Sequence, residues 1–214
     1  YASYLLGRLI SKGYIIEIVS TKSSLPIEGL EEIIGKNIHW VDPNLPCNWK
    51  SLGLRVPHIF FQAGWYKKPF ISLGNEVKHS GGKVILLSDN QFHGNLRQLF
   101  GSLYYRLKYK HLFDAVWVPG ASGKKLMKFY GVPKDKIFTH LYSSNENIFQ
   151  NGRKINLRSK QIIFVGRLIK VKGFKELILA FNRFIKNNPE WKLIVVGEGP
   201  LSTFMPNNKN FKRY

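Results

Sequence analysis

The 214-residue sequence contains a single cysteine, Cys47, and only 13 acidic residues against 33 lysines and arginines. One cysteine cannot form an internal disulfide, so a reducing compartment fits the chain. No apolar run approaches the roughly 18 residues that span a bilayer, and no signal peptide is visible. We therefore expect a cytoplasmic protein. The shortage of acids leaves a net charge of +20, which predicts an anionic partner: nucleic acid, a membrane face or a polyanionic small molecule.

Short apolar runs alternate with helical patterns through residues 1–150, which predicts an α/β fold with a doubly wound parallel sheet. The expected strands are 15–19, 38–41, 57–62, 83–87, 115–118 and 137–142, and the expected helices are 1–12, 69–78, 95–112 and 122–130. Because such a sheet seldom begins on a helix, we expect an earlier strand to be missing.

A basic, apolar-poor segment, 151–160, is expected to link this N-terminal Rossmann-like domain to the start of a second one, residues 161–214. The second part holds one strand–helix–strand unit and a polar tail, 202–214. An open sheet of this length buries too little apolar surface to fold by itself. We therefore expect this part to pack on the first domain or to be a truncated domain.

The strand–helix–strand unit carries two cations where its first strand turns into its helix. Residues 162–165 form an apolar run that ends at Gly166, and Arg167 and Lys172 follow before Gly173 opens the helix. Ligands of parallel sheets bind at this edge, and helix N-termini favour anions. An arginine fork and a lysine point charge would complete a diphosphate site. The alternative is that both side chains merely solvate a loop.

The helix that follows should bury one face, and the next strand should end in a second glycine turn. Its apolar residues recur at helical spacing: Phe174, Leu177, Ile178, Phe181, Phe184 and Ile185. The turn after the next strand contains Gly197 and Gly199.

The expected helix 95–112 shows two different faces. Leu96, Leu99, Phe100, Leu103 and Leu107 form a stripe that we expect to meet the sheet. The other side presents a set that suits an anionic membrane surface: Arg97, Tyr105, Arg106, Lys108 and Tyr109. A solvated basic face is the alternative.

Two motifs resemble a known family. Gly166-Arg167-Leu168-x-x-x-Lys172-Gly173, with the later run from Val195 to Leu201, resembles the start of the nucleotide-binding domain of retaining family-4 glycosyltransferases of the GT-B fold. In that family the Arg and Lys at these positions contact the donor diphosphate. The resemblance implies a site bordered by Gly166 and Gly173, with Gly197 and Gly199 on the nucleotide side.

The run 88–98, with 113–120, is similar to a branch of that family that builds bacterial surface polysaccharides. The resemblance implies that Asp89 and His93 are catalytic and that Asn90 and Gly94 line the acceptor or donor-sugar loop. His93 departs from the family's commonest arrangement. If the loop is purely structural, Asp89 and Asn90 would instead cap the helix that begins at Asn95.

The resemblance implies retaining sugar transfer from a nucleotide-diphosphate sugar to a hydroxyl of an acceptor such as a glycan, without a metal or another cofactor. A lipid-linked acceptor at the inner face of the membrane would account for the positive charge, and we keep this as a hypothesis. The family's paired glutamates downstream of Gly199 are absent from these residues, so the chain as given is expected to be inactive. A truncated, non-catalytic membrane-surface or partner-binding module remains the alternative. An epimerase of the same fold also remains, because fold does not fix function. No helix-turn-helix, zinc-finger or RNA-recognition motif supports nucleic-acid binding.

Overall fold

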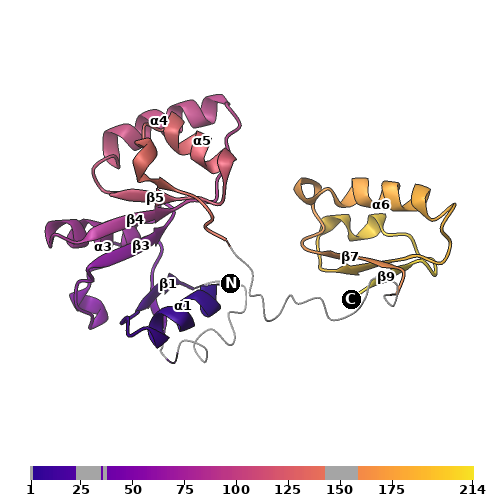
Figure 1. The fold of residues 1–214 in the computed structure, drawn as a ribbon, viewed down its shortest axis with the longest axis horizontal. Helices are drawn as coiled ribbons and strands as arrows, with labels where there is room; N and C mark the ends of the chain where they lie inside the picture. The colour runs from indigo at the N-terminus through magenta and orange to yellow at the C-terminus, as the bar shows by residue number, and fades with distance from the viewer. Residues whose placement is uncertain (1, 23–34, 36–37, 143–158) are drawn as a thin grey trace. The chain divides into compact units, whose positions relative to one another are not determined.

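The computed structural model describes residues 2–22, 35, 38–142 and 159–214, and the chain separates into two compact units, 1–149 and 150–214. Each unit contains parallel strands and helices, so the α/β class predicted from the sequence is confirmed (Figure 1). Most of the expected linker, 151–160, lies outside the described residues.

The first unit is organised around a parallel sheet whose strands follow the chain order. They are β3 (Ile59–Ala63), β4 (Lys83–Leu87), β5 (Ala115–Trp117) and β6 (Ile137–Phe138). A separate parallel pair is formed by β1 (Ile18–Thr21) and β2 (Ile38–Val41). The bounds of β2 and β4 match the prediction, whereas β1 begins three residues later than expected.

Helix α3 (Lys68–His79) lies beside β3 and β4 (Figure 1). Its Leu73 and Val77 side chains are fully buried. At Gly74 a β-carbon would lie 2.9 Å from Oε1 of the buried Gln62 side chain, so a larger residue here would displace that side chain. Among the described residues, this unit also contains α1 (Ala2–Ser11), α4 (Leu96–Lys108), α5 (Ala121–Phe129), η1 (Lys50–Leu52) and η2 (Lys134–Lys136).

An aromatic cluster fixes the rotation of α4. The Trp65 ring is surrounded by four tyrosines at centroid distances of 5.3–6.1 Å: Tyr104, Tyr105, Tyr109 and Tyr130. Tyr105 is only 3% exposed, and burial raises its pKa to about 12. Leu96, Leu99, Phe100, Leu103 and Leu107 are instead exposed, so the prediction that this stripe meets the sheet is wrong.

The second unit is a three-stranded parallel sheet of β7 (Gln161–Val165), β8 (Lys192–Val196) and β9 (Phe211–Arg213). Helix α6 (Phe174–Phe184) covers one face of it (Figure 1). Phe174, Ile178 and Phe181 are buried and Leu177 and Ile185 partly buried, as the apolar spacing predicts, but Phe184 is 37% exposed, so the prediction is wrong for it. The prediction that 202–214 form only a polar tail is wrong, because these residues contribute to η5 (Pro200–Phe204) and form β9.

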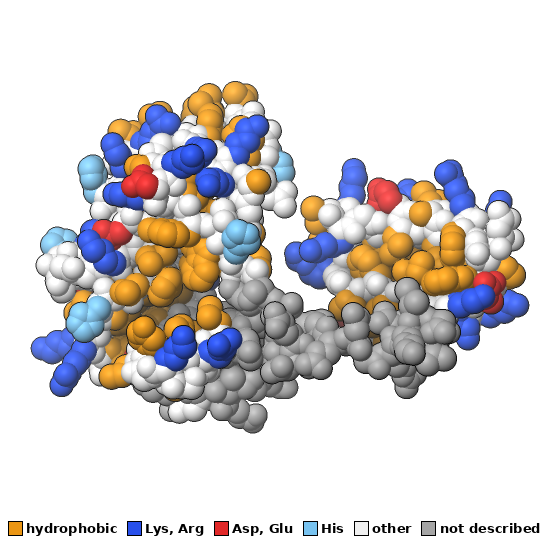
Figure 2. Space-filling model, viewed as in Figure 1, with side chains coloured by type: hydrophobic (Ala, Val, Ile, Leu, Met, Phe, Trp, Pro, Cys, Tyr) orange, Lys and Arg blue, Asp and Glu red, His pale blue; other side chains and the backbone are white. Residues whose placement is uncertain are grey.

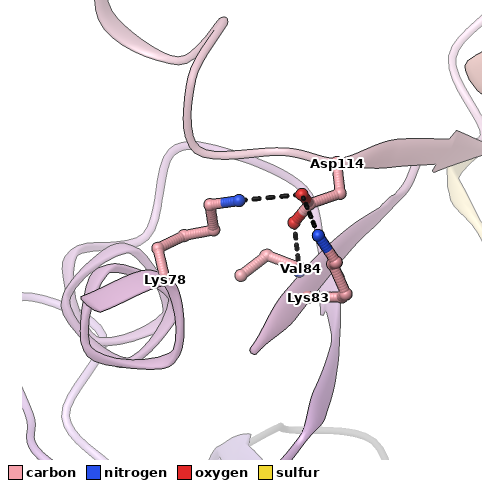
Figure 3. Close-up of polar contacts among 4 residues, drawn as sticks. All are labelled: Lys78, Lys83, Val84 and Asp114. Atoms are coloured by element: carbon pink, nitrogen blue, oxygen red, sulfur yellow. Dashed lines mark hydrogen bonds and ion pairs between the residues drawn. The ribbon is translucent and has the colours of Figure 1, made fainter. Parts of the chain in front are cut away.

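The partly buried carboxylate of Asp114 joins α3 to the amino ends of β4 and β5 (Figure 3). Asp114 accepts hydrogen bonds from Lys78 Nζ at 2.8 Å and from the Val84 backbone N–H at 2.9 Å, and it forms an ion pair with Lys83 at 3.5 Å. Its own N–H donates to the Val84 carbonyl. Burial raises the pKa of the carboxyl, but these hydrogen bonds and charges outweigh it, so the pKa lies below its usual value.

We expect Asp114→Asn to lower the free energy of unfolding at neutral pH by about 1–2 kcal/mol, because charge-assisted bonds to a partly buried carboxylate are lost. A carboxyl whose pKa is depressed on folding stabilises the fold above its unfolded pKa, and this contribution is lost as pH falls. The difference between parent and variant should therefore shrink below about pH 4 in denaturant titrations.

Glu190→Gln provides the control for Asp114→Asn. Glu190 pairs with Lys160 at the same 2.8 Å distance, but both side chains are far more exposed than those of Asp114 and Lys78. The control should change stability little, since exposed ion pairs contribute little. Equal effects of the two variants would contradict the structural role of Asp114.

Candidate functional site

The turns that follow β7 and β8 run side by side as an extension of the parallel ladder. The Gly166 N–H donates to the Val196 carbonyl at 3.0 Å, and the Leu168 N–H donates to the Glu198 carbonyl at 2.8 Å. The Leu168 carbonyl then accepts from Leu201 N–H at 3.0 Å. The two turns are therefore hydrogen-bonded to each other at the carboxyl edge of the sheet, where ligands of parallel sheets bind.

Two glycines make this close approach possible. A β-carbon on Gly197 would overlap the Gly166 carbonyl oxygen, and one on Gly199 would lie 2.5 Å from the Leu168 carbonyl oxygen. Both have positive φ angles, 141° and 154°, which residues with a β-carbon rarely adopt. The sequence prediction placed these glycines beside a nucleotide, and the structure gives them a backbone-packing role at the same edge.

Arg167 is held at this edge by its neighbours. Gly166 lies against the second turn, and the Leu168 side chain is fully buried in the core of the second unit. The Arg167 side chain is exposed and makes no hydrogen bond or ion pair with other described residues. A guanidinium without a protein partner, on a constrained backbone, is free to bind an anion.

Lys172 lies a few residues further along the same connection, at the end of the short helix η4 (Lys170–Lys172). It is also exposed and unpaired among the described residues. Gly173 follows in the left-handed conformation, with φ 66°, and begins α6 without a side-chain cap. The first N–H groups of α6 therefore lie next to Lys172, which adds a positive helix terminus to the two cations. The carboxylate of Glu176, in the first turn of α6, partly offsets this positive charge.

In the first unit, the loop that contains Asp89, Asn90, His93 and Gly94 follows β4 and is ordered by Gln98. Gln98 Oε1 accepts from the N–H groups of His93 at 2.8 Å and Gly94 at 3.0 Å, and its Nε2 donates to the Gln91 carbonyl at 2.6 Å. The Phe92 N–H donates to Ser122 Oγ at 3.0 Å. The loop backbone is therefore tied to α4 and α5.

The backbone of this loop is hydrogen-bonded, but its polar side chains have no partner among the described residues. Asp89, Asn90 and His93 are exposed and have no side-chain partner among the described residues. The helix cap is Asn95, whose side chain accepts from Gln98 N–H at 3.0 Å, so the capping role considered for Asp89 and Asn90 is wrong. Sequence reasoning missed Gln98, although Asn95-x-x-Gln98 matches a capping box.

The five residues expected to face a membrane do not share one surface. Tyr105 lies in the core, and Tyr109 is half-buried against Trp65. Arg106 donates from Nε to the Tyr130 carbonyl at 3.2 Å and from a terminal nitrogen to the Phe129 carbonyl at 2.9 Å, which ties α4 to α5. Only Arg97 and Lys108 are exposed and without a backbone partner in the described part of the chain. The prediction that Tyr105 faces a membrane is therefore wrong, because its side chain is buried.

The predicted site residues thus form two groups. Asp89, Asn90, His93 and Gly94 belong to the first unit, whereas a second group lies at one edge of the second unit: Gly166, Arg167, Lys172, Gly173, Gly197 and Gly199. Within the described residues, no cluster of His, Cys, Asp or Glu is placed to hold a metal ion. No helix in the described ranges is long and apolar enough to cross a bilayer.

Residues 145–209 match a family model described as "Glycosyl transferases group 1". The match covers less than half of the chain and includes the two glycine turns, Arg167 and Lys172. No curated protein matches the chain at a significant level.

Two solved structures are similar to the chain. A protein described as a UDP-N-acetylglucosamine 2-epimerase, from Listeria monocytogenes, has a TM-score of 0.59 and 12% identity, with 98% of this chain and 64% of that one covered. A UDP-GlcNAc 2-epimerase from Neisseria meningitidis bound to UDP-GlcNAc has a TM-score of 0.46 and 12% identity, with 86% and 60% covered. The chain therefore spans less than two-thirds of either structure, and the first match supports the Rossmann-like fold.

We expect Gly199→Ala to destabilise the second unit by about 2 kcal/mol or more, because a β-carbon must displace the Leu168 backbone and adopt an unfavourable φ. Gly173→Ala is the control: its φ is also positive, but no atom lies within 4 Å of its β-carbon position. Thermal unfolding should show a larger loss for Gly199→Ala than for Gly173→Ala. Equal losses would mean that φ strain alone, and not the paired turns, requires glycine.

Proposed function

We propose that this chain contributes to sugar transfer from a nucleotide-diphosphate donor to a hydroxyl of a glycan or lipid-linked acceptor, with retention of configuration, in the synthesis of a bacterial surface polysaccharide. The observation that carries the proposal is the match of residues 145–209 to a glycosyltransferase model, at the edge that displays Arg167 and Lys172. Retention rests on the resemblance of the motifs 166–173 and 195–201 to retaining enzymes, and the surface-polysaccharide role rests on the resemblance of 88–98 and 113–120.

The chemistry assigned to this edge is electrostatic. The bond from the anomeric carbon to the diphosphate breaks, a bond to the acceptor oxygen forms, and the acceptor hydroxyl passes its proton to the leaving diphosphate. Negative charge grows on the leaving diphosphate, where Arg167, Lys172 and the N-terminus of α6 stabilise it. Asp89 or His93 orients the acceptor hydroxyl. The reaction takes place at the cytoplasmic side of the membrane, without a metal.

Epimerisation of a nucleotide sugar is the second candidate, because the structure with a TM-score of 0.59 is described as an epimerase. Both reactions would use the same diphosphate contacts, but epimerisation needs no acceptor. Formation of an epimer from a nucleotide sugar alone would favour that reaction. A product that appears only when a hydroxyl acceptor is added would favour transfer.

We expect Arg167→Ala and Lys172→Ala each to weaken binding of UDP to the chain by about 1–2 kcal/mol, because each removes a charged contact to the diphosphate. Glu176→Gln should strengthen binding, since it removes the acid in the first turn of α6. Isothermal titration calorimetry with UDP as the probe measures all three changes.

Lys192→Ala is the matched control for these titrations. Lys192 is an exposed lysine at the amino end of β8, the edge opposite the paired turns, so its loss changes the net charge equally without changing the site. Identical affinities for Lys172→Ala and Lys192→Ala would show that UDP responds only to net charge, which would contradict the proposed site.

A further inference from the structure

Helix α4 contacts the end of α5 through a small residue and two polar ones: Gly101, Ser102 and Arg106. A β-carbon at Gly101 would lie 2.6 Å from the Tyr130 hydroxyl, so glycine allows α4 to approach α5 closely. Ser102 Oγ donates to the Phe129 carbonyl at 3.0 Å, and Arg106 donates to the carbonyls of Phe129 and Tyr130. With Tyr105 buried beside Trp65, these contacts allow only one rotation of the helix.

The outward face of α4 is consequently apolar. Five side chains at positions i, i+3, i+4, i+7 and i+11 are between 52% and 75% exposed: Leu96, Leu99, Phe100, Leu103 and Leu107. We refer to these five residues as the α4 apolar face. Leu99 and Leu103 also line a depression of about 190 Å³ that continues to Phe129 of α5. A contiguous apolar surface of this kind is typical of an interaction site.

Positive charge surrounds the α4 apolar face. Helices α4 and α5 contain six basic residues and no acid: Arg97, Arg106, Lys108, Lys124, Lys125 and Lys128. Lys108 Nζ lies 5.1 Å from the centre of the exposed Tyr104 ring, and Lys125 Nζ lies 4.6 Å from that of Phe92. Figure 2 shows hydrophobic and basic side chains interspersed over the part of the first unit formed by α4 and α5.

We propose that the α4 apolar face docks on a membrane surface rich in anionic lipid. The leucine and phenylalanine side chains enter the boundary between headgroups and acyl chains. Lipid phosphates are contacted by exposed basic side chains that donate no hydrogen bond to a backbone carbonyl of the described residues: Arg97, Lys108, Lys125 and Lys128. The helix has 13 residues, about 20 Å at 1.5 Å per residue, so it lies in the plane of the surface and does not cross the roughly 30 Å hydrocarbon core.

Charge also favours anionic lipid over a second copy of the chain as the partner of the α4 apolar face. A second copy of the chain would bring two molecules of net charge +20 together at a basic surface, which electrostatic repulsion opposes. Anionic lipid supplies both the apolar layer that the leucines need and the negative charge that the lysines need. The inference does not depend on sugar transfer, because it concerns a face of the first unit alone.

The test is sedimentation of the 214-residue chain with vesicles of phosphatidylglycerol and phosphatidylcholine, or with phosphatidylcholine alone. The triple variant Leu99→Gln, Phe100→Gln, Leu103→Gln should weaken binding to anionic vesicles by about tenfold or more, because three inserted apolar side chains are lost. Lys125→Gln with Lys128→Gln should weaken binding and reduce its salt dependence. All these side chains are exposed, so thermal unfolding should be unchanged.

The matched control is Leu179→Gln, which replaces a leucine that is 55% exposed on α6 of the second unit. It should bind vesicles like the parent. Equal binding of the parent and the triple variant would overturn the proposal, as would equal binding to vesicles with and without phosphatidylglycerol. A dimer of the parent in solution that the triple variant dissociates would overturn it in favour of a second copy.

Discussion

The close backbone approach between the turns after β7 and β8 is the constraint on which the candidate site depends. Gly197 and Gly199 allow the second turn to lie against residues 166–168, and the buried Leu168 side chain anchors the first turn from below. Arg167 therefore has a fixed backbone without any side-chain partner among the described residues. A cation displayed in this way does not have to break a protein contact before it binds an anion, which lowers the cost of recognition.

The second unit could be predicted well from local sequence because its signals are local. The apolar run before Gly166 and the helical spacing from Phe174 to Phe181 correctly predicted β7 and the buried side of α6. The pairing of the glycine turns could not be predicted, because it requires contact between segments about thirty residues apart. Strand β9 was missed because Phe211 is the single apolar residue buried in it.

Helix α4 illustrates what periodicity leaves undetermined. The spacing of its leucines correctly indicates an apolar face, but the direction of that face depends on the inner contacts of Gly101, Ser102 and Tyr105. Those contacts involve Trp65 and the end of α5, which are distant in sequence. By contrast, the Asn95-x-x-Gln98 spacing was a local signal of a helix start that could have been found. The Gln98 side chain accepts from the N–H groups of His93 and Gly94, which explains why the loop that carries His93 is ordered.

The tyrosines around Trp65 give the first unit an intrinsic optical reporter. Four phenol rings lie within 6.1 Å of the indole, a separation at which absorbed energy passes from tyrosine to tryptophan with high efficiency. Two of these rings, Tyr104 and Tyr105, belong to α4 itself. Movement of this helix far from Trp65 would therefore raise tyrosine emission relative to tryptophan emission, so such a movement can be followed without an attached dye.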